Sequence, residues 1–308
     1  MDLLKKKQNF TEEINRSRNW INEADLIVIG IGGGLSASGG IDYNNPHLAK
    51  EHFPDYYRMG YKKLIELYEL YRIITDENAR AYWGYWGRYI KSIGYDTAVG
   101  NGYKDLLRLI RNKNYLIYTT NYDAQVQRTG FEEEKIIALK GDCRFLKCNQ
   151  GCCEKTYESH DLLETMIKSM SGNLEVSGNK VPRCPHCGGY LVPNLQGRSN
   201  VNVDKFINSE QTDKNINQVD EFENRINHEV SSIGGIPRII FLELGVGTSK
   251  IDLIRAPFEH FVEQHQNTQL VRINKYEADV PEELAGKALS IQADLEEVIA
   301  ELASGVVS

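Results

Sequence analysis

The first stretch whose residues could do chemistry is rich in glycine and serine. It follows an apolar, β-branched run at residues 26–29 and continues as Gly-Ile-Gly-Gly-Gly-Leu-Ser-Ala-Ser-Gly-Gly. A strand that breaks into glycines lets backbone N–H groups approach a phosphate or diphosphate. A tight strand-to-helix turn that binds nothing is the alternative. The two serines and the closing Gly-Ile-Asp-Tyr, which no phosphate loop requires, favour a binding loop.

A second polar stretch, Thr-Thr-Asn-Tyr-Asp at residues 119–123, follows an apolar run at 115–118. Open α/β sheets bind their ligands at the carboxyl ends of parallel strands. If the strand continues, Asn121 and Asp123 point the same way and could face one ribose or one water. The alternative is an Asx-type turn that only starts a helix over residues 124–130.

The cysteines form the third group, because two close pairs stand about thirty residues apart. The predicted zinc ligands are Cys148, Cys152, Cys184 and Cys187. Four thiolates in such a ribbon close a tetrahedron around Zn²⁺ and leave no position for catalysis. Cys153 competes with Cys152, and a ribbon that has lost its metal is the alternative. Cys143 is predicted to be a small buried apolar group, and His186 to be solvated.

The elements that must position these groups are apolar runs that each end in small or polar residues. Strands are predicted at residues 26–29, 115–118, 237–244, 270–274 and 288–292, with helices at 11–23, 103–112, 218–231 and 295–302. Asp294 is predicted to cap the last helix. Strands that alternate with helices predict an α/β fold, a doubly wound, Rossmann-like parallel sheet with one ligand at its carboxyl edge. The aromatic residues from 53 to 89 favour the wall of a helical layer over a ligand-lining cluster.

Length and composition bound the rest of the prediction. A chain of 308 residues fits one large domain, from residues 1–42, 90–145 and 232–308, with a small domain made of an aromatic helical segment (43–89) and a zinc-ribbon and helical insertion (146–231). A net charge of −7 without a basic block argues against nucleic acid. No apolar run approaches a membrane span, and no secretory signal is present. Clustered cysteines predict a reducing, cytoplasmic location.

Together these motifs resemble the sirtuin family from about residue 24 to residue 302. The glycine run through Asp42 and Tyr43 is similar to GAGxSxxSGIPDF, and residues 119–130 to TQNxDxLHxxAG. Lys140-Gly141 with Cys148 is similar to HGxxxxxxC, and residues 184–193 to CPxCGGxLRP. Residues 247–249 are similar to the family's GTS loop, and Ile273-Asn274 to the strand that meets the adenosine ribose.

The departures from the family bear on its reaction. Lys140 stands where deacylases have the histidine that acts as general base, and an unperturbed lysine with a pKa near 10.4 is a poor base at neutral pH. Only burial or a neighbouring cation could lower that pKa. The family's Leu-His is Gln125-Val126, and its acyl-lysine-binding strand reads Asn-Leu-Gln-Gly at residues 194–197. The machinery for holding NAD and cleaving its glycosidic bond is retained.

One branch, the macrodomain-linked class M sirtuins, matches these departures better. It resembles this chain in GGxSAxxGxxY, TTNxD, xGDxxxxxC, CxxxC followed by KTY, and LELGVG, although its members usually carry Gln at the position of Lys140. The resemblance implies NAD-dependent protein ADP-ribosyl transfer. It also implies an acceptor that is a lipoyl-carrier protein, and a macrodomain hydrolase as the opposing enzyme.

The resemblance assigns a role to each motif residue. Asn121, Asp123 and Lys140 are the predicted catalytic residues, with Asp123 stabilising positive charge at the anomeric carbon. The predicted NAD-binding residues are Gly30, Gly32, Gly33, Gly34, Ser36, Ser38, Gly39, Asp42, Tyr43, Thr120, Gly247, Thr248, Ser249, Asn274 and Asp294. A deacylase, an NAD hydrolase and an NAD-sensing module remain as alternatives; the paired Asn121 and Asp123 argue against a pure sensor.

Overall fold

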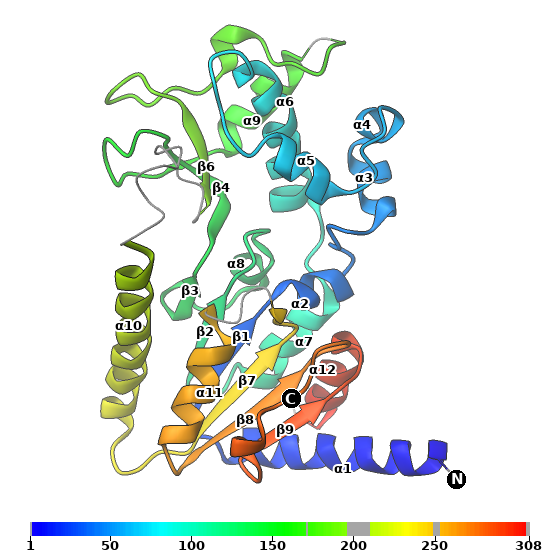
Figure 1. The fold of residues 1–308 in the computed structure, drawn as a ribbon, viewed down its shortest axis with the longest axis vertical. Coiled ribbons are helices and arrows are strands. Elements are labelled where there is room, and N and C mark those ends of the chain that lie inside the picture. The colour runs from blue at the N-terminus through cyan, green and yellow to red at the C-terminus, as the bar shows by residue number, and fades with distance from the viewer. Residues whose placement is uncertain (1, 171, 196–209, 249–252, 306–308) are drawn as a thin grey trace.

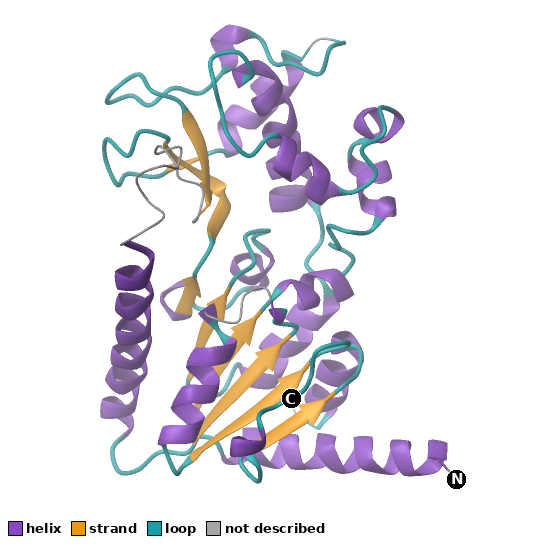
Figure 2. Ribbon diagram, viewed as in Figure 1, coloured by secondary structure: helices purple, strands orange, loops and turns teal. Residues whose placement is uncertain are grey.

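The computed structural model describes residues 2–170, 172–195, 210–248 and 253–305, and for residues 2–8 and 210–221 it describes the backbone only. Two units follow one another along the long axis of the molecule (Figure 1). The lower unit is a sheet covered by helices, and the upper unit consists of short helices, loops and a small sheet (Figure 2). The strands of the lower sheet point their carboxyl ends at the upper unit.

The large sheet has six parallel strands in the order β3-β2-β1-β7-β8-β9. They are β1 (Leu26–Ile31), β2 (Tyr115–Thr119), β3 (Ile136–Ala138), β7 (Ile239–Leu244), β8 (Thr268–Ile273) and β9 (Ala288–Ile291). The chain winds outward from β1 to β3 and then returns to start again at β7, beside β1. Such a reversal is a topological switch point, where doubly wound sheets bind ligands.

Helices cover both faces of this sheet, which confirms the predicted doubly wound class. One face packs on α1 (Asp2–Glu23), α2 (Gly33–Ser38), α7 (Asn101–Ile110) and α12 (Leu295–Ser304), and the other on α10 (Glu210–Ile233) and α11 (Arg255–Gln264). Every residue of β1, β2 and β7 is buried, as apolar runs that face two helical layers require. Asp294 caps α12 as predicted, since its carboxylate accepts a hydrogen bond from the Glu296 N–H.

The upper unit has a core of its own. It contains α3 (Pro46–His52), α4 (Pro54–Arg58), α5 (Leu64–Leu70), α6 (Ala79–Tyr89), a π-helical turn (Ile90–Asp96), α9 (His160–Lys168), and a small antiparallel sheet of β5 (Tyr157–Glu158), β4 (Gly141–Cys148) and β6 (Leu191–Leu195). Trp83, Trp86 and Tyr85 are fully buried in its centre. The aromatic segment is therefore a packed wall, as favoured from the sequence.

Several elements differ from the sequence-based expectation. The helix expected from residue 11 begins at Asp2, and the expected helix 218–231 begins at Glu210. The helix α8 (Gln125–Thr129) is shorter than the expected helix 124–130, and neither β3 nor α9 was predicted. Runs of three to nine residues show too little periodicity for such predictions. The domain boundaries remain a prediction. Among the described residues, no helix is long and apolar enough to cross a membrane.

Candidate functional site

The glycine-rich turn lies at the switch point between β1 and β7. A Cβ atom on Gly32 would lie 2.5 Å from the Gly245 carbonyl oxygen, and one on Gly34 would lie 2.7 Å from the Gly245 Cα. The Gly34 N–H also donates to the Gly245 oxygen at 2.9 Å. These two glycines are therefore required by the close approach of two backbones.

Gly33 and Gly30 differ from that pair and from each other. A Cβ atom on Gly33 would meet no atom within 4 Å, so this residue presents bare backbone to open space. Gly30 lies inside β1, where a Cβ would lie 2.8 Å from the Phe258 ring and would also strike Ile254. Packing against α11 accounts for Gly30, so its presence needs no cofactor contact. Of Gly30, Gly32, Gly33 and Gly34, Gly33 alone faces open space.

Asn121 lies at the centre of a buried hydrogen-bond network. Its Nδ2 donates to the Gly32 carbonyl oxygen at 2.9 Å, and lies 3.0 Å from both Ser36 Oγ and Tyr103 Oη. Because a carbonyl oxygen only accepts, the amide nitrogen must face Gly32. The amide thus ties the polar stretch after β2 to the glycine turn after β1.

Asp123 belongs to the same network. Ser36 Oγ donates to its Oδ2 at 2.5 Å, and the Gln125 N–H donates to its Oδ1 at 3.1 Å. Burial raises the pKa of Asp123, while these two hydrogen bonds oppose the rise. The carboxylate therefore forms the Asx-type turn into α8, and it also faces Ser36; a contact with a ribose stays a prediction.

The route by which Asn121 and Asp123 meet differs from the expected one. The strand ends at Thr119, so the two side chains do not share a strand face. Ser36 joins them instead, and Ala124 turns the chain with a left-handed φ of 64°. Thr120 is buried beside them, and its N–H donates to the Ile31 carbonyl oxygen at 3.0 Å.

Aromatic rings join this edge to the upper unit. The Tyr43 ring lies 5.9 Å from the Tyr122 ring, which in turn stacks on Tyr68 of α5 at 6.2 Å between centroids. The hydroxyls of Tyr43 and Tyr89 are hydrogen-bonded, and burial raises the pKa of Tyr43 well above its usual range. Tyr43 therefore forms a neutral, fixed wall between Asp123 and the aromatic core.

Lys140 lies in the turn between β3 and β4 and is half-buried. Two residues further on, Asp142 is buried, and Arg144 Nη2 contacts its Oδ2 at 2.7 Å. The Cys143 N–H donates to the Tyr122 carbonyl oxygen at 3.1 Å, which fixes the start of β4 next to the Asn121–Asp123 stretch. Cys143 is fully buried, as predicted.

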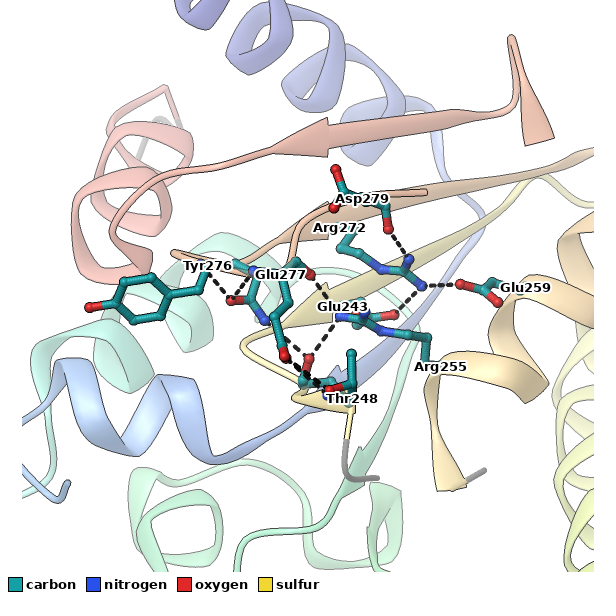
Figure 3. Close-up of polar contacts among 10 residues, drawn as sticks. Glu243, Thr248, Arg255, Glu259, Arg272, Tyr276, Glu277 and Asp279 are labelled. Atoms are coloured by element: carbon teal, nitrogen blue, oxygen red, sulfur yellow. Dashed lines mark hydrogen bonds and ion pairs between the residues drawn. The ribbon is translucent and has the colours of Figure 1, made fainter. Parts of the chain in front are cut away.

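The loops after β7 and β8 are bound to each other on the other side of the switch point (Figure 3). Asn274 Nδ2 donates to the Val246 carbonyl oxygen at 3.0 Å, and the Thr248 N–H and Oγ1 both donate to the Glu277 carboxylate at 2.9 Å. These hydrogen bonds lower the pKa of Glu277. Gly247 lies in the same loop, and Ser249 falls outside the described residues.

A buried ion network lies beneath these two loops. Glu243 of β7 contacts Arg255 at 3.0 Å and Arg272 at 2.8 Å, and Arg272 also contacts Glu259 at 2.6 Å (Figure 3). Arg255 also donates to the carbonyl oxygens of Val246 and Glu277, both at 2.8 Å. The ion pairs thus fasten both loops to the sheet.

The remaining residues predicted to bind NAD make hydrogen bonds, ion pairs or close contacts within the protein. Ser38 Oγ donates to the Leu35 carbonyl oxygen at 3.0 Å, and Asp42 Oδ1 accepts from the Asn44 N–H at 2.9 Å. Gly39 lies against Gly100, with 3.4 Å between its ideal Cβ position and the Gly100 Cα. Asp294 pairs with Lys275 at 3.6 Å in addition to its capping bond. Their contacts with NAD remain predictions.

The four predicted metal ligands converge. Their sulfur atoms all lie within 4.8 Å of one another, with 3.5 Å from Cys148 Sγ to Cys187 Sγ and from Cys152 Sγ to Cys184 Sγ. Tetrahedral zinc with bonds of about 2.3 Å separates its thiolates by roughly 3.8 Å. The cluster therefore fits a structural zinc ion, and it includes Cys152 rather than Cys153. His186 is exposed, as predicted.

Tyr103 and Glu277 are two site residues that sequence reasoning missed. Tyr103 reads as an ordinary apolar position near the start of an amphipathic helix, and its hydroxyl reaches Asn121 only through tertiary packing. Glu277 follows Asn274 by three residues, and a carboxylate just beyond a strand end could have been noted.

A glycine turn at the switch point of a doubly wound sheet, with buried Asn and Asp at the same edge and a four-cysteine ribbon, defines a Rossmann-like, nucleotide-binding class of fold. Solved structures of that class match nearly the whole chain. A Sir2 homologue in complex with NAD covers 94% of this chain and 92% of its own, with a TM-score of 0.53 and 16% identity. A Sir2 mutant with a deacetylated peptide and 3′-O-acetyl ADP-ribose gives 0.51 and 18%, over 94% and 97%.

Relatives by sequence point the same way, although no protein-family model matches the chain. A "Protein ADP-ribosyltransferase" of Staphylococcus aureus is 25% identical over 294 residues, which span 94% of this chain and 86% of that protein. A "Probable bifunctional ADP-ribose hydrolase/ADP-ribosyltransferase" of Fusarium oxysporum is 24% identical over 92% of this chain, and the match spans 46% of that longer protein. The predicted resemblance to the sirtuins is confirmed, and the chain has the Sir2 fold.

Proposed function

We propose that this protein is an NAD-dependent ADP-ribosyltransferase of sirtuin type, which moves ADP-ribose from NAD to an acceptor protein and releases nicotinamide. The observation that carries the proposal is the buried pair Asn121 and Asp123, which Ser36 joins at the switch point. The names of both sequence relatives support it. NAD itself fits the edge, because Gly33 presents bare backbone to open space next to Gly32, whose carbonyl oxygen accepts from the buried Asn121 amide.

The residues would divide the work by position. When bound, NAD supplies an ADP-ribosyl group whose leaving group, nicotinamide, needs no general acid. The glycine turn would hold the diphosphate, while Asn274 and the loop of Thr248 would meet the adenosine half. Asp123 would stabilise positive charge at the anomeric carbon, since a carboxylate there favours an oxocarbenium-like centre. Tyr43 and Tyr122 would exclude water on the nicotinamide side.

The residue at position 140 favours transfer over deacylation. Deacylation needs a general base at the nicotinamide ribose, and at the position that matches the deacylases' histidine this chain has Lys140, whose ordinary pKa makes it a poor base near pH 7. Transfer needs only an acceptor held near the anomeric carbon. We propose a lipoyl-carrier protein as that acceptor, on the resemblance to the class M sirtuins, and a macrodomain hydrolase as the enzyme that reverses the reaction.

The test is to incubate the purified protein with NAD labelled in its adenylate. Parallel reactions contain a lipoylated carrier protein, the same carrier without lipoate, an acetyl-lysine peptide, or no acceptor. We expect label on the carrier, release of nicotinamide in equal amount, and no deacetylated peptide. Asn121→Ala is the inactive control.

Each other outcome has a definite meaning. Deacetylated peptide would show that a base serves despite Lys140 and would overturn the proposal. NAD consumed equally with and without acceptors would indicate a hydrolase. Binding of NAD without turnover in any reaction would indicate a sensor. Label on both carriers would keep the transferase and remove the lipoyl specificity.

A further inference from the structure

We propose that Tyr103 is a positioning residue for this reaction, which orders Asn121, Ser36 and Asp123 into one hydrogen-bonded chain. The reaction is the one given under the proposed function, whereas the positioning role is argued from the hydrogen bonds of Tyr103. Tyr103 is 1% exposed and comes from α7, whereas the three residues it orders come from the segments after β1 and β2. Its hydroxyl lies 2.8 Å from Ser36 Oγ and 3.0 Å from Asn121 Nδ2.

The direction of the chain follows from counting protons. A hydroxyl has one proton, and Ser36 directs its proton to the Asp123 carboxylate, which when ionised can only accept. Ser36 therefore only accepts from its other neighbours, so Tyr103 donates to it, as does Asn121 Nδ2 at 3.0 Å. The Tyr103 oxygen in turn accepts from the Asn121 amide. One route runs from Asn121 to Tyr103 to Ser36 to Asp123, beside the direct bond from Asn121 to Ser36, and each bond polarises the next.

The hydroxyl and the ring of Tyr103 therefore have different roles. The ring packs in the core below the sheet edge, with Leu35 and Leu106. The hydroxyl strengthens the hydrogen bond from Ser36 to Asp123 and so favours the charged carboxylate, against the burial that raises the pKa of Asp123. The hydroxyl oxygen also accepts a hydrogen bond from the Asn121 amide, and this bond helps to fix the orientation of that amide.

Other groups around Asp123 act on its charge as well. Asp142 raises its pKa, and Asp142 is itself paired with Arg144. Three further groups interact electrostatically with Asp123: the hydroxyls of Tyr43 and Tyr103 and the thiol of Cys143. Burial raises the pKa of all three, so they are neutral at pH 7. Ser36 and the Gln125 N–H donate to the carboxylate, and only the Ser36 bond depends on Tyr103.

The decisive variant is Tyr103→Phe, which keeps the ring and removes the hydroxyl. We expect kcat for nicotinamide release to fall about tenfold or more, with KM for NAD changed by less than about threefold. The rate should also rise with pH around a midpoint higher than in the wild type, because Asp123 loses support for its charged form. Tyr115→Phe is the matched control: Tyr115 is buried, and its hydroxyl accepts from the Glu132 N–H at 3.0 Å at the far end of the sheet.

A double-mutant cycle with Ser36→Ala separates a chain from independent contacts. If Tyr103 acts through Ser36, the double variant should be hardly slower than the slower single variant. Multiplied effects of the two substitutions would overturn the proposal. So would a Tyr103→Phe enzyme with the kcat and pH profile of Tyr115→Phe.

A readout that needs no acceptor keeps this inference distinct from the proposed function. Carbon-13 labelling of aspartate carboxyl groups, assigned with Asp123→Asn, reports the titration of Asp123 directly. An upward shift of that titration in Tyr103→Phe, in a protein that transfers to no acceptor, would sink the transferase and keep the role of Tyr103. Transfer by the wild type, with an unshifted Asp123 titration in Tyr103→Phe, would support the transferase and overturn the role of Tyr103.

Discussion

At the scale of single residues, this protein depends on polar groups that are buried together. Asn121 and Asp123 are 8% and 2% exposed, and both bond to Ser36. Buried polar groups are costly unless their hydrogen bonds are complete. The network therefore stabilises the fold and fixes the side chains at the candidate site.

Replacing Asn121 by alanine should separate activity from stability. We expect turnover of NAD to fall about a hundredfold or more, as for loss of a preorganised donor. The free energy of unfolding should fall by about 1–3 kcal/mol, because Gly32 and Tyr103 lose a buried donor. Nicotinamide release and urea unfolding measure the two effects. Asn114→Ala, at the opposite end of the sheet, should change neither by more than a small amount, and intact turnover in Asn121→Ala would contradict the assignment.

Asp123 should make stability depend on pH in a predictable direction. Its folded pKa is raised by burial, so its contribution to stability is fully present below its ordinary pKa of about 3.9 and is lost as pH rises through the folded value. Asp123→Asn has no carboxyl group to ionise, so it does not lose this stability as pH rises. We expect the variant to gain stability relative to wild type between pH 4 and pH 8, while losing activity. Urea unfolding of both proteins across that range checks the sign, and a difference that does not change with pH would refute it.

At the scale of elements, the glycine turn after β1 shows that neighbouring glycines serve different purposes. Gly32 and Gly34 allow the turn to approach the end of β7, while Gly33 faces open space. The motif is thus partly a packing device and partly a surface for a ligand.

Alanine at these glycines should therefore give opposite results. Gly32→Ala places a methyl group 2.5 Å from the Gly245 oxygen and should cost about 1–3 kcal/mol of unfolding free energy. Gly33→Ala should leave stability nearly unchanged and weaken NAD binding, because its added methyl occupies the ligand side. Thermal unfolding and calorimetric titration with NAD distinguish them. Equal loss of stability in both variants would show that Gly33 is also a packing position.

At the scale of the whole molecule, β4 connects the candidate site to the cysteine cluster. It begins at Gly141, beside the Tyr122 carbonyl oxygen that accepts from the Cys143 N–H, and it ends at Cys148. Its partner β6 lies just beyond the second cysteine pair. A metal that closes the ribbon therefore holds a strand whose other end borders Asp123.

Removal of zinc should consequently reduce turnover, although no cysteine is among the predicted catalytic residues. We expect about one zinc ion per chain by elemental analysis, and parallel losses of metal and of nicotinamide release on chelation. Cys184→Ser should lose the metal, whereas Cys153→Ser should keep it, since Cys153 lies outside the four-sulfur cluster. Full activity of the metal-free protein would disprove the coupling.

Sequence by itself determined the parts of this protein that local pattern encodes. The fully buried strands β1, β2 and β7, the doubly wound class, the cap at Asp294 and the four zinc ligands follow from apolar runs, turn residues and cysteine spacing. Only the tertiary structure decided which polar groups meet. Tyr103 joins Asn121, and Glu277 joins Thr248, because helix packing and strand order bring distant segments within 3.0 Å. The spacing of residues along the chain carries no record of such contacts, so they appear only once the chain is folded.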